Sequence, residues 1–129
     1  MEKEKIVLID TNIIIDHLRN FEPATNFFNS ISEHNLIIFS AITETELLSG
    51  QANNNKEKRE ELLQLLNQWY KIPIENPIAL LAGDLSRKYN LEVPDSIIAA
   101  TALLSKAILV TKNEKHFISV SNLILNKPY

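Results

Sequence analysis

The chain has 129 residues, of which 45% are hydrophobic and 22% are charged. This composition is that of an ordinary globular protein, and the length predicts a single domain covering residues 1–129. The absence of cysteine excludes disulfides, thiolate zinc sites and cysteine nucleophiles. A net charge of −3 disfavours a protein that binds polyanions through a basic surface alone, so an acidic site for a nucleic acid would need bound cations.

The sequence contains no candidate membrane span and no secretion signal. Residues 1–5 are mostly charged, and only four apolar residues follow before Asp10, which is too short for a signal peptide. No uninterrupted apolar run approaches the roughly 18 residues of a membrane span. We therefore expect a soluble protein of the cytoplasm.

Short aliphatic runs alternate with helical periodicities along the chain. Apolar residues recur at offsets of three and four within residues 24–31, 62–69 and 78–89, and residues 96–104 are apolar on almost every face. The aliphatic runs are continuous rather than alternating, which is typical of strands buried on both faces of a parallel sheet. They predict strands at residues 6–10, 36–40, 70–74, 107–111 and 123–126. The alternation predicts an α/β fold with a mainly parallel five-stranded sheet.

An acid or an amide stands close behind several of these predicted strands. Asp10 and Asn113 each follow a strand, and Glu46 lies in the helix that begins after the strand ending near Ser40. Asp95 begins the helix that leads back to the strand at 107–111. The carboxyl ends of parallel strands meet at one edge of a sheet, where ligands bind. The topology therefore predicts that these four side chains converge.

Converging carboxylates need a positive partner, because like charges in one pocket push one of the acids toward its protonated form. Oxygen ligands without cysteine or clustered histidine favour Mg²⁺ or Mn²⁺ over zinc. Two such ions about 4 Å apart activate water and stabilise the leaving oxygen of a phosphodiester. The pattern predicts a metal site for phosphate chemistry.

Each candidate residue also has an ordinary structural interpretation. Residues 10–12 are good caps for the helix that follows, and Asp95 after Pro94 is a good N-cap. Glu44 and Glu46 both suit the solvated face of a helix, and Asn113 suits a turn. Function is favoured only by the coincidence of four candidates at one edge.

Other polar residues are expected to have no role in the site. We expect Asp16 and Asp84 on solvated helix faces, and the three histidines show no metal-ligand spacing. The polar residues 51–61 predict a loop that enters a solvated helix. Lys112, Lys115 and Arg19 are candidates for contacts with phosphate, although a solvated surface is the better explanation of each.

Four motifs between Leu8 and Phe117 together resemble one protein family. They are LIDTN, SAITETELLSG, PDSIIAATAL and ILVTKNEKHF, in this order along nearly the whole chain. The set resembles the PIN-domain ribonucleases, and most closely the VapC-type toxins of bacterial and archaeal toxin–antitoxin pairs.

The resemblance implies a three-layer α/β/α sheet of order 3-2-1-4-5, an acidic site for Mg²⁺ or Mn²⁺, and endonucleolytic cleavage of RNA. The family's three acids fall on Asp10, Glu46 and Asp95 as metal ligands. Small polar residues that orient the first acid fall on three further positions, which are Thr11, Asn12 and Thr111.

The segment after the fourth strand often carries a further aspartate in this family, and here the matching stretch offers Asn113 and His116. Asn113 has no charge, so the resemblance implies one firmly bound ion and a second that binds with substrate. It also implies a homodimer and a cognate antitoxin protein as partners.

Two other classes of function remain as alternatives. A catalytically inactive PIN-like module that binds RNA or protein is compatible with Asn113, and such a module would tolerate a chelator. A haloacid-dehalogenase-type phosphotransferase needs a second aspartate where this chain has Asn12, and a receiver domain needs an acidic pair that is absent. Gly50 and Gly83 form no nucleotide-binding loop.

Overall fold

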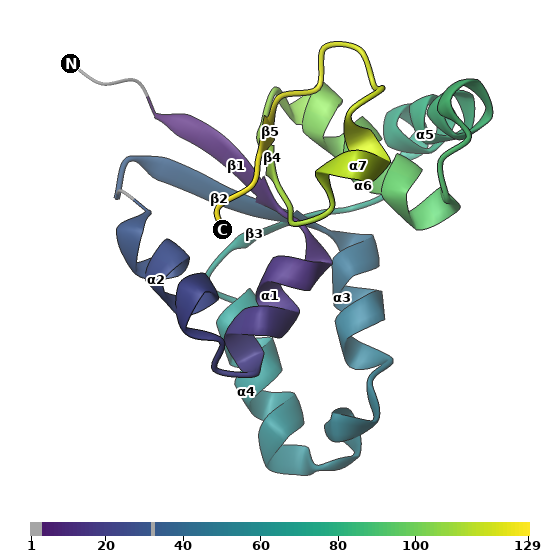
Figure 1. Ribbon diagram of the computed structural model, residues 1–129. Helices are drawn as coiled ribbons and strands as arrows, with labels where there is room; N and C mark the ends of the chain where they lie inside the picture. The colour runs from purple at the N-terminus through teal and green to yellow at the C-terminus, as the bar shows by residue number, and fades with distance from the viewer. Residues whose placement is uncertain (1–3, 32) are drawn as a thin grey trace.

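The computed structural model describes residues 4–31 and 33–129, and its centre is one sheet of five parallel strands (Figure 1). Of the chain start considered above, only residues 4 and 5 are described. The strands are β1 (Lys5–Ile9), β2 (Asn35–Ser40), β3 (Tyr70–Ile72), β4 (Ile108–Val110) and β5 (Leu125–Asn126). Their order across the sheet is β3-β2-β1-β4-β5, and each neighbouring pair is parallel. The predicted fold class and strand order are confirmed.

Helices cover both faces of this sheet, which gives the three layers (Figure 1). They are α1 (Thr11–Leu18), α2 (Glu22–Ser30), α3 (Ala41–Leu48), α4 (Lys56–Leu66), α5 (Asn76–Tyr89), α6 (Val93–Ser105) and α7 (Glu114–Phe117), with a 3-10 turn η1 (Gln51–Asn54). One apolar cluster joins the sheet to α1, α2 and α4, and the other joins it to α5, α6 and α7. Helix α3 contributes side chains to both clusters.

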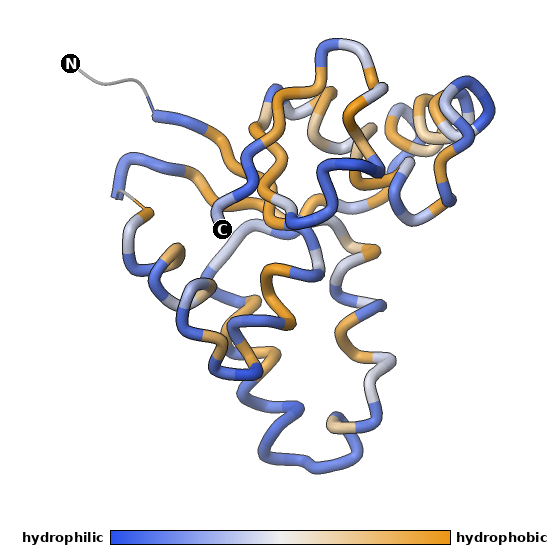
Figure 2. The backbone as a smooth tube through the Cα atoms, in the orientation of Figure 1, coloured by the Kyte–Doolittle hydropathy of each residue, from blue (hydrophilic) through white to orange (hydrophobic). Residues whose placement is uncertain are grey.

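The strands are continuously hydrophobic because successive side chains enter opposite clusters. In β1, Val7 and Ile9 pack toward α1 and α4, whereas Leu8 packs toward α5 and α6. In β4, Leu109 packs into the cluster of α5 and α6, whereas Val110 packs into the cluster of α1 and α4. Figure 2 shows this concentration of hydrophobic residues along the strands at the centre of the molecule. A sheet buried on both faces is therefore the physical origin of the unbroken aliphatic runs.

Strand β4 is one residue shorter at each end than its sequence pattern predicts, and two other strands each lose two residues at one end. β3 ends at Ile72 because the next residue, Pro73, has no N–H group to donate to the sheet. β5 contains two residues rather than four, and Leu123 and Ile124 approach the sheet without being part of the strand. β3 and β5 are the edges of the sheet.

A polar arm extends from the carboxyl edge of the sheet. Helix α3, the turn η1 and helix α4 form it, and its tip is strongly hydrophilic in Figure 2. The predicted loop and solvated helix over residues 51–61 correspond to η1 and the start of α4. No helix of the described chain combines the length and the hydrophobicity that crossing a membrane requires.

The buried centre of β1 makes a direct test of this packing. Leu8 is completely buried, so Leu8→Ala is expected to lower the free energy of unfolding by about 2–5 kcal/mol through lost contacts and a cavity. Ile118 is 74% exposed, and Ile118→Ala is the matched control, with an expected change below about 0.5 kcal/mol. Urea unfolding of both variants measures the difference. Equal losses would contradict the burial of Leu8.

Candidate active site

Three helices begin at the carboxyl edge of the sheet and carry the predicted acids there (Figure 1). Asp10 directly follows β1 and is the N-cap of α1. Ser40 ends β2 and caps α3 by accepting the Ile42 N–H at 3.1 Å, so Glu46 follows within two turns. Asp95 lies in the first turn of α6. Each acid therefore owes its position to a helix start at this edge.

Asp10 is buried and its two carboxylate oxygens are fixed by hydrogen bonds. Oδ1 accepts the backbone N–H of Thr11 at 2.8 Å. Oδ2 accepts the hydroxyl of Thr111 at 2.7 Å and the side-chain amide of Asn12 at 3.3 Å. The capping interpretation of Asp10 is therefore confirmed, and the carboxylate has one defined orientation.

The residues that bind Asp10 are themselves held by the segment after β4. The Thr111 hydroxyl accepts the backbone N–H of Asn113 at 3.0 Å, and the Asn12 carbonyl oxygen accepts that of Lys112 at 3.4 Å. The Asn113 side chain is exposed and does not cap α7. Asn113 therefore supports Asp10 through its backbone.

Glu46 is connected to the same site by the hydroxyl of Thr11. This hydroxyl lies 2.7 Å from Glu46 Oε1 and 3.0 Å from the hydroxyl of buried Thr43. Because a hydroxyl carries one proton, it donates to Glu46 and accepts from Thr43. Glu44, the other candidate in this helix, instead forms an ion pair with Lys71 at 2.9 Å. The geometry therefore links Glu46 to the site.

Asp95 is not the N-cap of its helix, so that interpretation is wrong. Glu92 occupies the cap position and Asp95 is the third residue of α6. The Asp95 carboxylate is half-buried, and Oδ2 lies 3.1 Å from Nδ1 of His116. His116 comes from α7, and no sequence pattern indicated that it would contact an acid.

Asp95 and Glu46 are close enough to Asp10 to affect it electrostatically. Burial raises the pKa of Asp10 to about 6, against the opposing hydrogen bonds from Thr111 and Thr11. The negative charges of Asp95 and Glu46 raise the Asp10 pKa further. Burial also raises the pKa of Asp95, although the charge and hydrogen bond of His116 oppose the rise. The sheet edge is therefore an incompletely compensated acidic region.

The chemistry of the donor set fits a hard divalent cation, because all three acids offer carboxylate oxygens. Within residues 4–31 and 33–129, however, no three His, Cys, Asp or Glu side chains form a group that could hold a metal ion. Glu46 and Asp95 are instead hydrogen-bonded to different residues, Thr11 and His116. The assignment of these acids as metal ligands stays a prediction.

Asp16 does not lie on a solvated face, so that prediction is wrong. Its Oδ2 lies 2.7 Å from Lys112 Nζ and accepts the Tyr129 hydroxyl at 2.8 Å. Burial opposes ionisation of Asp16, but the hydrogen bonds and charge of Lys112 and Tyr129 lower its pKa overall. Asp84 is exposed and pairs with Arg87, as expected for a solvated helix face.

Two open pockets flank the acids. One, of about 430 Å³, lies between α1, α3 and α4 and is lined by Glu46, Arg19 and Lys58 among others. The other, of about 390 Å³, contains His116, the partner of Asp95. A third pocket of about 440 Å³ lies beside Trp69 and Lys71 and includes none of the three acids.

Residues 7–123 match the model of the family described as PIN domain. The chain belongs to the PIN-domain family. The predicted family is therefore confirmed by a match that covers β2, β3, β4 and most of β1 and ends just before β5.

Named relatives of this PIN-domain chain are ribonucleases. The chain is 34% identical over 121 residues to Ribonuclease VapC19 of Mycobacterium tuberculosis, covering 85% of this chain and 90% of that one. It is 30% identical over 117 residues to Ribonuclease VapC10 of the same organism, covering 87% and 86%. A solved toxin–antitoxin complex from Klebsiella pneumoniae contains a similar chain, with a TM-score of 0.81, 31% identity and coverage of 95% and 98%.

The raised pKa of Asp10 predicts a pH-dependent cost of folding in the absence of divalent cations. The pKa of Asp10 in the folded chain, about 6, exceeds the ordinary value of 3.8. Protonated Asp10 therefore contributes fully to the free energy of unfolding below pH 3.8, and this contribution is lost as the pH rises through about 6. Asp10→Asn removes the ionisation and is expected to raise the free energy of unfolding by about 2–3 kcal/mol near pH 8.

Urea unfolding in EDTA at a series of pH values tests this expectation. The difference in free energy of unfolding between Asp10→Asn and the native chain isolates the effect of Asp10 from that of the other titrating groups. That difference should grow between about pH 4 and about pH 8. A constant difference over this range would show that Asp10 titrates normally.

Proposed function

We propose that this chain is a divalent-metal-dependent endoribonuclease that hydrolyses RNA phosphodiester bonds, and that it is the cytoplasmic toxin of a type II toxin–antitoxin system. One observation carries the proposal: buried Asp10 lies in the electrostatic field of Glu46 and Asp95 at the sheet edge of a PIN-domain chain. The ribonuclease names of the two curated relatives support the choice of RNA as substrate.

In this proposal Asp10 and Asp95 hold Mg²⁺ or Mn²⁺ directly, and Glu46 completes the site or positions water. A bound cation would supply an activated water and neutralise charge on the phosphate. Thr11, Asn12 and Thr111 keep the Asp10 oxygens in one orientation through the hydrogen bonds described above. Asn113 supports Thr111 through its backbone N–H.

The alternative of a catalytically inactive binding module is not favoured. The sequence suggests this alternative because the Asn113 side chain is uncharged. However, Asn113 supports Thr111 through its backbone N–H group, which does not depend on the side chain. The three acids that the family motifs indicate are all present, and the relatives have ribonuclease names.

Two protein partners follow from the same proposal. A protein antitoxin is supported by the similar chain in the K. pneumoniae toxin–antitoxin complex. A homodimer is supported by exposed apolar side chains around α5 and the start of α6, where Leu80 is 72% and Val93 is 63% exposed. Burying such side chains against a second copy would stabilise a pair.

Removing the charge of one acid is the direct test of catalysis. Asp10→Asn and Asp95→Asn conserve side-chain shape, and each is expected to lower kcat/KM for RNA cleavage by at least about a hundredfold. Asp84→Asn, on an exposed part of α5, is the control and should cleave like the native chain. Circular dichroism checks that all variants fold. Native-rate cleavage by Asp10→Asn would refute the assignment.

Removal of the metal provides a second test that also has a readout other than activity. EDTA is expected to stop RNA cleavage, and added Mg²⁺ or Mn²⁺ should restore it. Near neutral pH the same ions should raise the melting temperature of the native chain, because they bind the folded state preferentially. Asp10→Asn should show a much smaller increase. Cleavage that persists in EDTA would exclude the metal-dependent mechanism.

A further inference from the structure

We propose that the pocket beside α7 binds the phosphate backbone of RNA next to the cleavage point. This lysine pocket is lined by Lys112, Asn113, Glu114, Lys115, His116 and Lys127 and has a volume of about 390 Å³. The inference rests on the proposed ribonuclease function, because it assigns a second part of the substrate to the same sheet edge.

The lysine pocket adjoins the acids through two of its own residues. His116 contacts Asp95 through Nδ1, and Asn113 donates its backbone N–H to Thr111, which binds Asp10. An RNA strand with one phosphate at the acids therefore has its neighbouring phosphates within reach of this pocket.

The charge of the pocket is opposite to that of the acidic region. Lys115 and Lys127 are exposed, and neither has an acidic partner within residues 4–31 and 33–129. Lys112 also lines the pocket, but its ammonium group forms the ion pair with Asp16. The one acid of the lining is Glu114, which is half-buried. The pocket lining thus carries two ammonium groups without an acidic partner in the described part of the chain, against the single carboxylate of Glu114.

The whole chain shows the same segregation of charge. Residues 107–129 contain three lysines and one glutamate, which gives this segment a charge of +2 in a chain whose total is −3. RNA carries one negative charge for each phosphate, and lysine ammonium groups bind phosphates as point charges. Because the carboxylates repel the substrate, binding needs positive charge close to them, and the lysine pocket provides it.

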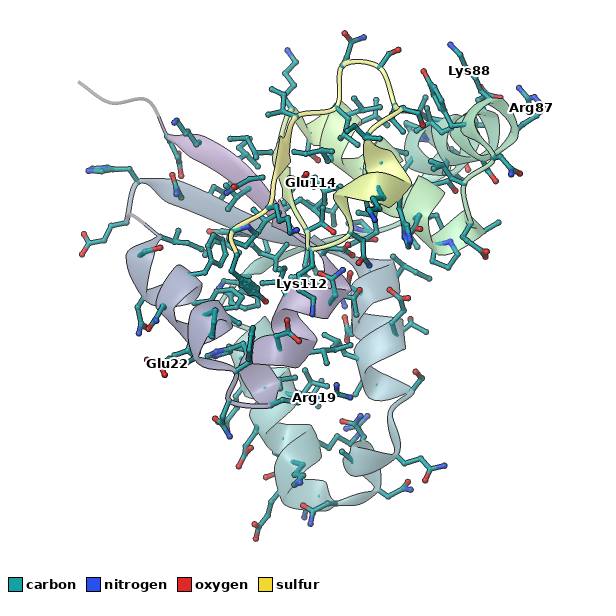
Figure 3. All side chains as sticks on the ribbon, viewed as in Figure 1. Arg19, Glu22, Arg87, Lys88, Lys112 and Glu114 are labelled. Carbon is teal, nitrogen blue, oxygen red and sulfur yellow. The ribbon has the colours of Figure 1, made fainter. Side chains whose placement is uncertain are left out.

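The fold brings the pocket together from two separate segments. Lys115 belongs to α7 after β4, whereas Lys127 directly follows β5, the neighbour of β4 in the sheet. Figure 3 shows Lys112 and Glu114 near the centre of the molecule, whereas Arg87 and Lys88 lie at the far end of α5. The basic residues of α5 are therefore unsuited to guide RNA into the acids.

A double variant with a matched control tests the proposal. Lys115→Gln/Lys127→Gln removes the two uncompensated charges, and Lys88→Gln/Lys106→Gln removes the same charge from α5 and from the residue that ends α6 before β4. Lys112 is left intact because it pairs with Asp16. All proteins also carry Asp10→Asn, so that a short fluorescein-labelled single-stranded RNA of mixed sequence stays uncut during the binding measurement.

Fluorescence anisotropy at a series of salt concentrations measures RNA binding. The Lys115→Gln/Lys127→Gln variant is expected to bind on the order of tenfold more weakly. The slope of the logarithm of the binding constant against the logarithm of the salt concentration should become shallower by about 1.4, the value for two lost phosphate contacts. The control variant should keep the affinity and the salt dependence of the parent. Unchanged binding and salt dependence in Lys115→Gln/Lys127→Gln would overturn the proposal.

Cleavage assays without Asp10→Asn separate this proposal from the ribonuclease proposal. With long RNA, Lys115→Gln/Lys127→Gln should raise KM with little change in kcat, whereas cleavage of a dinucleotide should be unaffected. If the native chain cuts RNA but the two double variants behave alike, only the lysine pocket is excluded. A native chain that neither binds nor cuts RNA would refute the ribonuclease proposal itself.

An acidic polypeptide is the competing occupant of the pocket. Labelled polyglutamate is therefore measured in parallel with the RNA. Loss of polyglutamate binding with retained RNA binding in Lys115→Gln/Lys127→Gln would assign the pocket to an acidic peptide and overturn the proposal. Selective loss of RNA binding supports it.

Discussion

The site depends on the burial of the Asp10 carboxylate at the end of β1. A side chain with 6% exposure cannot remain ionised without compensation, because burying a charge costs several kcal/mol. The compensation comes from Thr11 at the start of α1 and from Thr111 at the end of β4. Two strands that are separated by a hundred residues of sequence therefore meet at one carboxylate, and the Asp10 N–H also binds Val110 at 2.9 Å. Sheet register and site geometry are fixed by the same contacts.

The hydrogen bonds compensate the charge of Asp10 only in part, and this incomplete compensation favours the binding of a cation. The hydrogen bonds lower the Asp10 pKa, yet burial and the charges of Asp95 and Glu46 leave it near 6. Additional hydrogen-bond donors would remove that penalty, but they would also occupy the oxygens that a ligand needs. Thr11 and His116 hold Glu46 and Asp95 separately, so that the three acids share a field without closing into one cluster. A divalent cation is the counter-charge that fits this arrangement.

The sequence predicts the sheet and the acids because both depend on local patterns. Continuous aliphatic runs indicate doubly buried strands, and parallel topology then delivers Asp10, Glu46 and Asp95 to one edge. Apart from the N-cap of α6 and the ends of three strands, the errors concern contacts between distant segments. Helical periodicity places Asp16 on a face without showing that Lys112 and Tyr129 cover that face. The contact of His116 with Asp95 and the place of Lys127 beside Lys115 depend in the same way on how α7 and β5 pack.

The segment after β4 links the acidic region to the lysine pocket. Within three consecutive residues, Thr111 binds Asp10, Lys112 contacts Asn12 and Asp16, and Asn113 supports Thr111. The lysine pocket starts at this same segment, so its position relative to Asp10 is set by short hydrogen bonds rather than by flexible side chains alone. In the proposed function, a chain with a net negative charge accepts a polyanion because three of its lysines line a pocket beside the acids that repel the substrate.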